Sequence, residues 1–302
     1  MATAVGVSPQ STLADAFAYC EKLARSHYEN FTVVSWFLPK RLRPSLYSVY
    51  AFCRYTDDLG DEAIGDRLHL LDDWEADLRR CYDSTPKHPI LIALQDSIQR
   101  HQMPQEPFLR LIEANRMDQR NSRYQTYEDL LRYCDHSANP VGRMVLSVFG
   151  YSDLERQLLS DATCTALQFT NFWQDVGRDL RMGRVYIPLE DMAIFNYSVE
   201  ELQRGVVNNH FRLLMAFEVQ RARKLFRQGG RLVDIVGPEL RVDLKLFTLG
   251  GIKVLDAIEA NDFDVLSTRP SLSKAQKLRL MLSAMVRLKF QGRAPSHRSH
   301  RK

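Results

Sequence analysis

Apolar residues recur along most of this chain at the three- and four-residue spacing of a helix face. In residues 12–25, for example, Leu13, Phe17 and Cys20 follow this spacing. Glycine and proline are scarce and gather at a few boundaries, which leaves segments long enough for helices between them. No segment shows a competing strand pattern. The pattern predicts an all-α fold formed by a single domain.

We expect helices over residues 12–25, 44–65, 66–82, 90–101, 107–119, 126–149 with an interruption at 139–142, 153–179, 196–204, 207–228, 238–260 and 272–288. Residues 182–188 are expected to form an extended segment. The helical domain is predicted to cover residues 12–290, between a flexible leader over 1–11 and a basic, disordered tail over 291–302.

Two of the expected helices carry an acidic repeat in which aspartates stand four residues apart, at Asp57–Asp61 and at Asp175–Asp179. This spacing places both carboxylates of a repeat on one helix face, about 6 Å apart along the axis. Each repeat continues toward the N-terminus as a polar stripe in an otherwise apolar helix. The two stripes consist of Tyr50, Arg54, Asp57 and Asp61, and of Gln168, Asn171, Asp175 and Asp179.

Carboxylates in an apolar setting are costly unless a partner compensates for the lost hydration. Mg²⁺ is a suitable partner because it prefers one or two carboxylates together with water and phosphate oxygens. One aspartate pair usually marks a solvated helix face, and charge-paired structural helices remain the alternative. Two extended pairs favour a site that holds a diphosphate between metal ions. The predicted metal ligands are Asp57, Asp61, Asn171, Asp175 and Asp179, and the four aspartates are the predicted catalytic residues.

Other residues near the repeats are candidates for substrate binding. Arg54 would hold diphosphate oxygens or form a salt bridge within its helix, and the amide of Gln168 would contact phosphate or metal. Tyr50 and Tyr186 would line a cavity and stabilise a carbocation through their ring faces, although most aromatic residues here belong to the core. His27 is a further candidate, but a lone histidine is more often structural.

The composition is that of a soluble globular protein, with 45% hydrophobic and 26% charged residues. The net charge of +4 does not by itself indicate nucleic acid binding. The five cysteines lack CxxC spacing and are expected to be reduced thiols in a cytoplasmic protein. We expect neither a signal peptide nor a membrane span of about 20 apolar residues. The basic tail could contact anionic lipid, although a solvated terminus is the commoner case.

The segments around the repeats resemble the squalene/phytoene synthase family of head-to-head isoprenoid synthases. They cover residues 50–62, 171–179 and 183–188, and the likeness extends over residues 17–288. Residues 26–31 and 133–142, together with Phe172-Trp173-Gln174 before the second repeat, are most similar to the bacterial hydroxysqualene synthases. Many family members carry a Val-Ala-Gly-x-Val-Gly pattern at residues 137–142 and an arginine at Gln174. These departures fit an enzyme specialised for the second half of the family's reaction.

The resemblance implies a class I isoprenoid synthase helical bundle around a central cavity. It implies that the four aspartates hold presqualene diphosphate through Mg²⁺, with Arg54, Gln168 and Asn171 steadying it. Ionisation, rearrangement and capture by water would then give hydroxysqualene for hopanoid synthesis. Companion enzymes would supply presqualene diphosphate and reduce the alcohol. No GxGxxG pattern follows a strand, in agreement with a product formed without NADPH.

Two other interpretations remain open. The nearer one is a condensing synthase of the same family, which makes presqualene diphosphate, squalene or phytoene from prenyl diphosphates. The second, ranked lower, is a non-enzymatic helical protein that docks on a membrane through its tail and amphipathic helices. Peripheral contact with the inner face of the membrane is also compatible with catalysis, because the substrate is a lipid.

Overall fold

The structure is a computed structural model that describes residues 12–26 and 39–271. Within these ranges the regular structure is helical, apart from one isolated β-bridge between Arg123 and Val185. The helices are α1 (Leu13–Ser26), α3 (Arg43–Asp61), α4 (Arg67–Asp83), α5 (Pro89–His101), α6 (Glu106–Arg120), α7 (Tyr127–Ser137), α8 (Asn139–Val148), α9 (Leu154–Arg181), α10 (Leu189–Ile194), α11 (Val199–Gln203), α12 (Asn209–Gly229), α13 (Leu232–Ile235) and α14 (Pro238–Ala260). The prediction of an all-α, single-domain fold is confirmed.

The expected and observed helices differ in a few places. Helix α3 ends at Asp61 rather than near Gly65, whose φ of 105° lies outside the helical region. The short helices α10 and α13 were not expected. Helix α11 is shorter than predicted and begins after a capping box at Ser198. The predicted leader, the helix over 272–288, the basic tail and His27 lie outside the described residues.

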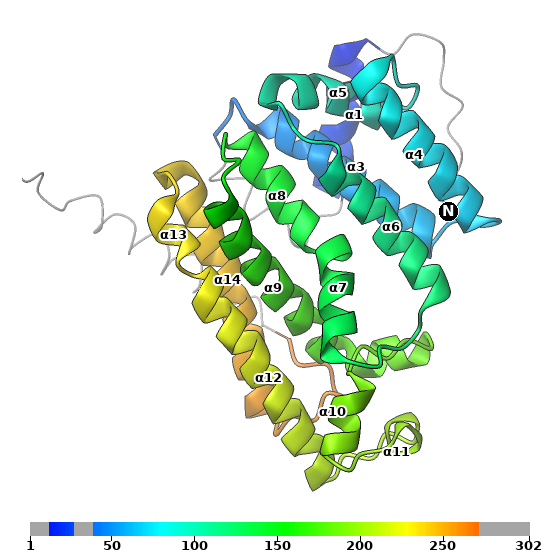
Figure 1. Cartoon of the computed structure of the whole chain (residues 1–302), viewed down its shortest axis with the longest axis vertical. Helices are drawn as coiled ribbons and strands as arrows, with labels where there is room; N and C mark the ends of the chain where they lie inside the picture. The colour runs from blue at the N-terminus through cyan, green and yellow to red at the C-terminus, as the bar shows by residue number, and fades with distance from the viewer. Residues whose placement is uncertain (1–11, 27–38, 272–302) are drawn as a thin grey trace, which may run out of the picture.

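Three helices, α3, α9 and α14, end on the same side of the molecule. At their starts, Arg41 forms an ion pair with Glu239, which ties the beginning of α3 to that of α14. At their ends, Arg184 follows α9 and pairs with Asp61 in the last turn of α3. The loop after α14 packs against Gly177 near the end of α9. We call this side the carboxyl end of the bundle. Figure 1 shows α9 running through the middle, with α12–α14 on one side and α3, α4 and α6 on the other.

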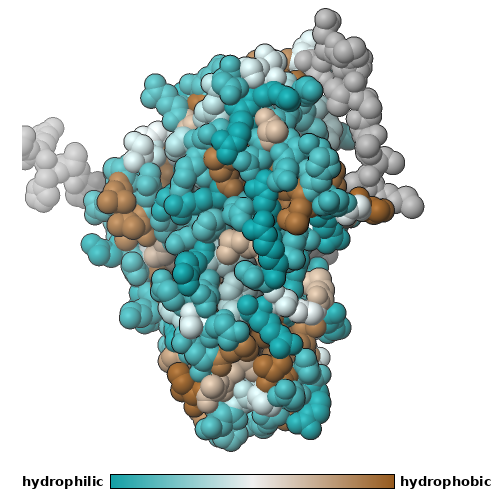
Figure 2. All heavy atoms as spheres, turned by 45° about the vertical axis from the view of Figure 1, so that its right-hand side comes forward, coloured by the Kyte–Doolittle hydropathy of each residue, from teal (hydrophilic) through white to brown (hydrophobic). Residues whose placement is uncertain are grey.

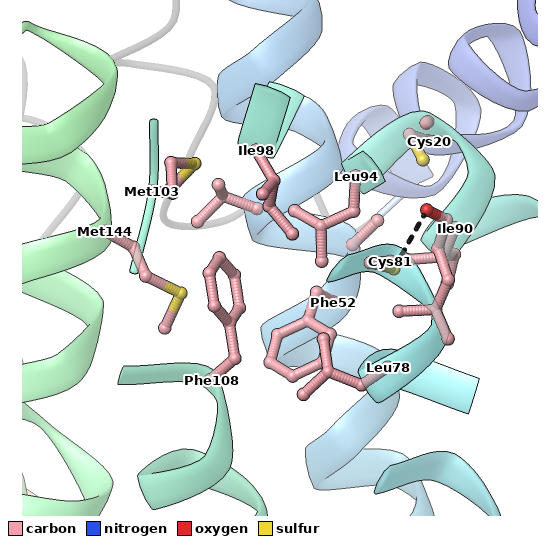
Figure 3. Packing of buried hydrophobic residues seen from close by; sticks show 14 of the residues in the cluster. Cys20, Phe52, Leu78, Cys81, Ile90, Leu94, Ile98, Met103, Phe108 and Met144 are labelled. Atoms are coloured by element: carbon pink, nitrogen blue, oxygen red, sulfur yellow. Dashed lines mark hydrogen bonds between the residues drawn. The ribbon is translucent and has the colours of Figure 1, made fainter. Parts of the chain in front are cut away.

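The buried apolar side chains form two main cores, and each acidic repeat is attached to one of them. The first core includes Phe52 and Phe108, which are fully buried with ring centroids 5.2 Å apart and lie among side chains from α3, α5 and α6 (Figure 3). The second core surrounds α9 and α12 and includes the fully buried Trp173 and Phe226. The repeat of α3 therefore adjoins the first core and the repeat of α9 the second.

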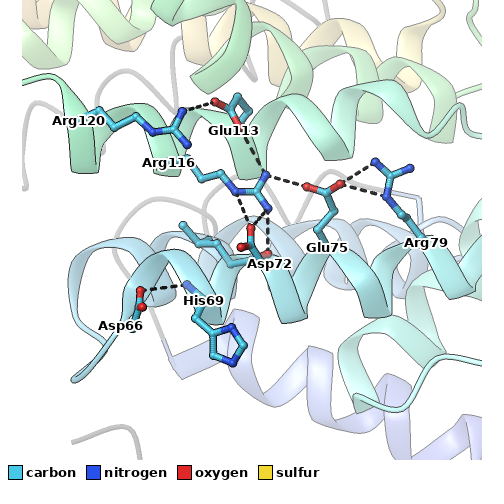
Figure 4. Close-up of polar contacts among 9 residues, drawn as sticks. Asp66, His69, Asp72, Glu75, Arg79, Glu113, Arg116 and Arg120 are labelled. Atoms are coloured by element: carbon cyan, nitrogen blue, oxygen red, sulfur yellow. Dashed lines mark hydrogen bonds and ion pairs between the residues drawn. The ribbon is translucent and has the colours of Figure 1, made fainter.

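Helix α6, which supports the first repeat, is fixed to α4 by a network of ion pairs (Figure 4). Arg116 on α6 lies 2.6 Å from a carboxylate oxygen of Asp72 and 2.7 Å from one of Glu75, both on α4. The Arg116 side chain is only 12% exposed, so these contacts are less screened by water than ordinary surface pairs. The network gives α6 a fixed position behind α3.

The described cysteines are free thiols, and Cys20, Cys81 and Cys134 are buried. Burial raises the pKa of Cys20 to about 12, so this thiol stays protonated and unreactive near neutral pH. The prediction that these thiols are buried is confirmed. In the part of the chain that the structure describes, no helix is both long and apolar enough to cross a membrane.

Asp243 on α14 is 1% exposed, and neither of its carboxylate oxygens has a hydrogen-bond partner. Burial raises its pKa to about 7, well above the value of about 3.9 in an unfolded chain. The ionised form therefore destabilises the fold, and this destabilisation grows as the pH rises from about 4 through about 7. Its full size is up to about 4 kcal/mol, from about three pKa units at 1.36 kcal/mol each.

We therefore expect Asp243→Asn to raise the free energy of unfolding more at pH 8 than at pH 5. Urea unfolding at both pH values measures this effect. Asp234→Asn on α13, where the side chain is exposed, is the matched control and should leave both values unchanged. Equal losses of stability between pH 5 and pH 8 in the wild type and Asp243→Asn would contradict the assignment.

Candidate functional site

The two acidic repeats meet at the carboxyl end of the bundle, where Arg184 connects them. Its guanidinium lies 2.7 Å from Asp61 of the first repeat. Its positive charge also acts on Asp179 of the second repeat, where it opposes the rise in pKa caused by burial. Two segments more than a hundred residues apart in sequence therefore face one position, as their pattern predicted.

The backbone of the bundle favours cations at this position. The C-terminus of a helix carries the negative end of the helix dipole, equivalent to about half an elementary charge. Because α3, α9 and α14 all end here, their carbonyl ends add to the field of the aspartates. Such an end of a bundle attracts positive ions.

A glycine within each repeat allows a neighbouring segment to approach the aspartates. A Cβ atom on Gly60 would lie 2.2 Å from Oδ1 of Asn115, so only glycine permits α6 to pack this closely on α3. The amide of Asn115 then donates to Oδ1 of Asp57 across 3.4 Å. In the second repeat, a Cβ atom on Gly177 would lie 3.1 Å from the carbonyl oxygen of Leu266. This contact brings the segment after α14 onto α9.

One carboxylate of each repeat has a raised pKa. A bound cation would oppose this rise, because it stabilises the ionised form. The pKa of Asp57 is raised to about 7, chiefly by burial, with the charge of Asp61 adding to the rise. Asp57 is nevertheless exposed to solvent, so a cation can reach its carboxylate. The pKa of Asp179 is also raised to about 7, first by burial and then by the charge of Asp175.

These residues fit a divalent cation that is coordinated both by their carboxylates and by oxygens of a substrate. Within the described residues, no three side chains of histidine, cysteine, aspartate or glutamate lie close enough to hold a metal ion by themselves. Mg²⁺ suits such an arrangement, since it is commonly held by one or two carboxylates with water and phosphate oxygens. Asp57 and Asp61 would hold it on α3, and Asp175 and Asp179 on α9.

Arginines pair with the acidic residues of both repeats. Arg54 lies 2.6 Å from Asp58 and 2.9 Å from Glu62, which is the salt bridge within a helix that the sequence suggested. Arg269, after α14, donates to Oδ2 of Asp175 across 2.9 Å and to the side-chain Oε1 of Gln174 across 3.0 Å. Sequence analysis missed Arg269 because it belongs to no motif and only the fold brings it to α9.

Aromatic rings cover the inner side of the second repeat. Tyr186 stacks on Phe172 with ring centroids 3.9 Å apart and an interplanar angle of 8°. Both line a small recess together with Asp179 and Arg184. Tyr186 therefore lies beside the acidic residues, as predicted.

The remaining candidates occupy the expected helices. Asn171 is exposed and Gln168 partly buried on the face of α9 that carries Asp175. Tyr50 on α3 is partly buried, and burial raises its pKa. Their roles in binding metal or substrate stay predictions.

An all-helical bundle in which two aspartate repeats converge at the helix ends is the architecture of helical isoprenoid synthases. The chain belongs to the squalene/phytoene synthase family, whose model matches residues 24–276. The 15-cis-phytoene synthase of Synechococcus elongatus is 32% identical over 291 residues, which cover 92% of this chain and 94% of that protein.

Two solved structures share the fold and part of the sequence. The squalene synthase HpnC of Alicyclobacillus acidocaldarius has a TM-score of 0.81 and 50% identity, and the match covers 83% of this chain and 95% of that one. A dehydrosqualene synthase in complex with a ligand has a TM-score of 0.84 and 26% identity, with 92% and 98% of the two chains covered. These matches confirm the resemblance identified from the repeats. Enzymes of this family use divalent metals in catalysis.

Proposed function

We propose that this protein ionises presqualene diphosphate in the presence of Mg²⁺ and guides the rearranged cation to capture by water, giving hydroxysqualene and diphosphate. The observation that carries the chemistry is the convergence of both aspartate repeats at one position, bridged by Arg184. The choice of substrate is supported by the 50% identity to a bacterial HpnC squalene synthase.

The acidic residues would bind the diphosphate through the metal, and bound Mg²⁺ would neutralise the negative charge that develops on the leaving group. Asp57, Asp61, Asp175 and Asp179 supply oxygen ligands from two opposite helices. Asn171 would add an amide oxygen to this set.

The arginines would change partners when substrate binds. Arg184 and Arg269 now neutralise Asp61 and Asp175, and cations that take over these carboxylates would free both guanidinium groups. The freed groups are suited to phosphate oxygens, which accept two parallel hydrogen bonds from arginine. Arg54 and Gln168 would support the diphosphate from the two stripes.

The aromatic side chains beside the second repeat would protect the carbocation after the diphosphate leaves. Tyr186, which stacks on the buried Phe172, lies beside Asp179, and an aromatic ring next to a cation stabilises it by about 0.5–2 kcal/mol. Tyr50 would contribute a further ring from α3. Water must still reach one carbon of the cation to form the alcohol.

A condensing synthase that joins two prenyl diphosphates is the second candidate. It is favoured by the phytoene synthase of Synechococcus elongatus, which is 32% identical over 92% of this chain. Both reactions use the same diphosphate site, so the difference lies in the substrate that the cavity accepts.

The two candidates are separated by incubating the purified protein with Mg²⁺ and either presqualene diphosphate or farnesyl diphosphate, without NADPH. Mass spectrometry identifies the products. We expect hydroxysqualene from presqualene diphosphate and no consumption of farnesyl diphosphate. Consumption of farnesyl diphosphate would instead assign the condensing reaction.

The proposed reaction implies partners. One enzyme must form presqualene diphosphate, and a reductase must replace the hydroxyl of the product by hydrogen to give squalene. Since both substrate and product are lipids, we also propose peripheral contact with the cytoplasmic face of a membrane. Hydrophobic side chains gather at the lower end of the molecule in Figure 2, where Figure 1 shows α10–α12. The exposed residues there include Ile194, Leu213 and Phe217.

A further inference from the structure

Gln174 on α9 has no role in the function proposed above, although it adjoins Asp175 of the second repeat. Its side chain is buried, with an exposed fraction of 7%, and both ends of its amide form hydrogen bonds. The nitrogen Nε2 donates to the carbonyl oxygen of Pro270 across 2.5 Å, and the oxygen Oε1 accepts from Nη2 of Arg269 across 3.0 Å. These contacts fix the amide, because the reverse orientation would turn its oxygen toward a carbonyl and its NH₂ toward a guanidinium.

An amide suits this position because it can donate and accept at the same time. Arginine and lysine side chains only donate hydrogen bonds, and an ionised glutamate only accepts them. Gln174 therefore matches a carbonyl on one side and a guanidinium on the other, which a charged side chain of either sign cannot do.

The segment after α14 is held in one shape and presents Arg269 to α9. Oδ1 of Asp264 accepts from the backbone N–H groups of Leu266 and Ser267, across 3.2 and 2.9 Å, which stabilises a turn. Beyond this turn, Gln174 attaches the segment to α9 on the C-terminal side of Arg269. The backbone is therefore fixed on both sides of Arg269, and its side chain starts from a defined place.

The Arg269 guanidinium is held by two contacts of different kinds. It forms an ion pair with Asp175, in which Nε lies 2.5 Å from Oδ1 and Nη2 lies 2.9 Å from Oδ2. Its second contact is the hydrogen bond to the uncharged amide of Gln174. The Arg269 side chain is 51% exposed, so the surrounding packing does not fix it. A cation that binds Asp175 would compete with the ion pair but would leave the hydrogen bond to Gln174 in place.

We infer that Gln174 keeps Arg269 beside the second repeat after Mg²⁺ displaces the guanidinium from Asp175, so that Arg269 is placed to bind the diphosphate. This inference rests on the proposed function in one respect, namely that a diphosphate is bound through Mg²⁺ at the repeats. Gln174 acts through Arg269 and is a positioning residue. Without it, the half-exposed arginine loses its order when the ion pair opens, and diphosphate binding must supply the entropy of ordering it again.

The test measures the dissociation constant of inorganic diphosphate with excess Mg²⁺ by calorimetry, and so does not depend on the prenyl chain of the substrate. A hydrogen bond to a charged group is worth a factor of about 10–100 in an equilibrium constant. We therefore expect binding about tenfold weaker in Gln174→Met and about 30-fold weaker in Arg269→Met than in the wild type. Gln174→Leu should give the same result as Gln174→Met. Thermal unfolding checks that each variant is folded at the temperature of the titration.

The double variant separates positioning from a purely structural role. If Gln174 acts through Arg269, then Gln174→Met should have no further effect when Arg269 is already methionine. A structural role, in which Gln174 only holds the segment after α14, predicts the same factor with and without the arginine. Equal factors in the two backgrounds would overturn the inference.

Gln157→Met is the matched control. Gln157 lies near the other end of α9, and its side chain also donates to a backbone carbonyl, that of Ser152, across 3.1 Å. This variant should bind diphosphate as the wild type does. Wild-type affinity in Gln174→Met would overturn the inference and leave the proposed function intact. A wild-type protein that binds no diphosphate in the presence of Mg²⁺ would overturn the proposed function, and the role of Gln174 with it.

Discussion

Asp57→Asn should lose about 10³-fold or more in turnover while retaining its fold. The amide keeps the shape of the side chain but removes the negative charge that would bind the metal and, through it, the diphosphate. In the metal-free protein the same change removes a carboxylate whose pKa burial raises to about 7, so stability should not fall. Diphosphate release with saturating substrate and thermal unfolding give the two measurements. Asp175→Asn should lose a similar factor, because the second repeat binds the same leaving group.

Asp73→Asn is the control for these variants. Asp73 lies on α4 with its side chain 70% exposed, away from both repeats. We expect turnover and stability equal to those of the wild type. Turnover by Asp57→Asn or Asp175→Asn within about threefold of wild type would exclude these aspartates as metal ligands.

Arg221→Met should cost about 3–5 kcal/mol of the free energy of unfolding, the largest effect on stability that we expect from a single substitution. Arg221 on α12 pairs with Asp191, whose side chain is 0% exposed, and with the equally buried Glu218. Its guanidinium also lies 4.2 Å from the ring centroids of both Tyr127 and Phe217. Methionine fills the space but leaves the carboxylates without a cation, and breaking a buried pair from one side is strongly destabilising.

Arg223→Met, two residues further along α12, provides the comparison. Arg223 lies 2.9 Å from Asp256 and 2.8 Å from Glu259, but these carboxylates are 38% and 36% exposed. Water can hydrate them when the arginine is lost, so the expected cost is about 1 kcal/mol or less. Urea unfolding of both variants measures the contrast. Equal losses would show that Arg221 does not neutralise a buried acidic cluster.

The helical period predicted most of the fold because each long helix here has an apolar face that the cores bury. It failed where too few residues were available to show a period, as in α10, with six residues, and α13, with four. The predicted end of the α3 helix was wrong by four residues. Gly65 lies beyond that end with a φ of 105°, and the sequence does not show at which residue before a glycine a helix stops.

The sequence could predict those site residues that follow a regular local spacing. The two repeats share a four-residue spacing, so the sequence identified both and predicted that they meet. Arg269 carries no such signal. It reaches Asp175 across 94 residues of sequence. Before the fold is known, it resembles an ordinary solvated charge.

The central claim is that both repeats together hold one diphosphate through divalent cations. A crystal structure with Mg²⁺ and an unreactive thio-analogue of a prenyl diphosphate tests it most directly. The account predicts metal ions coordinated by diphosphate oxygens and by at least one carboxylate from each repeat, Asp57 or Asp61 on α3 and Asp175 or Asp179 on α9. A diphosphate bound away from these carboxylates, or metal ions coordinated by only one repeat, would contradict it.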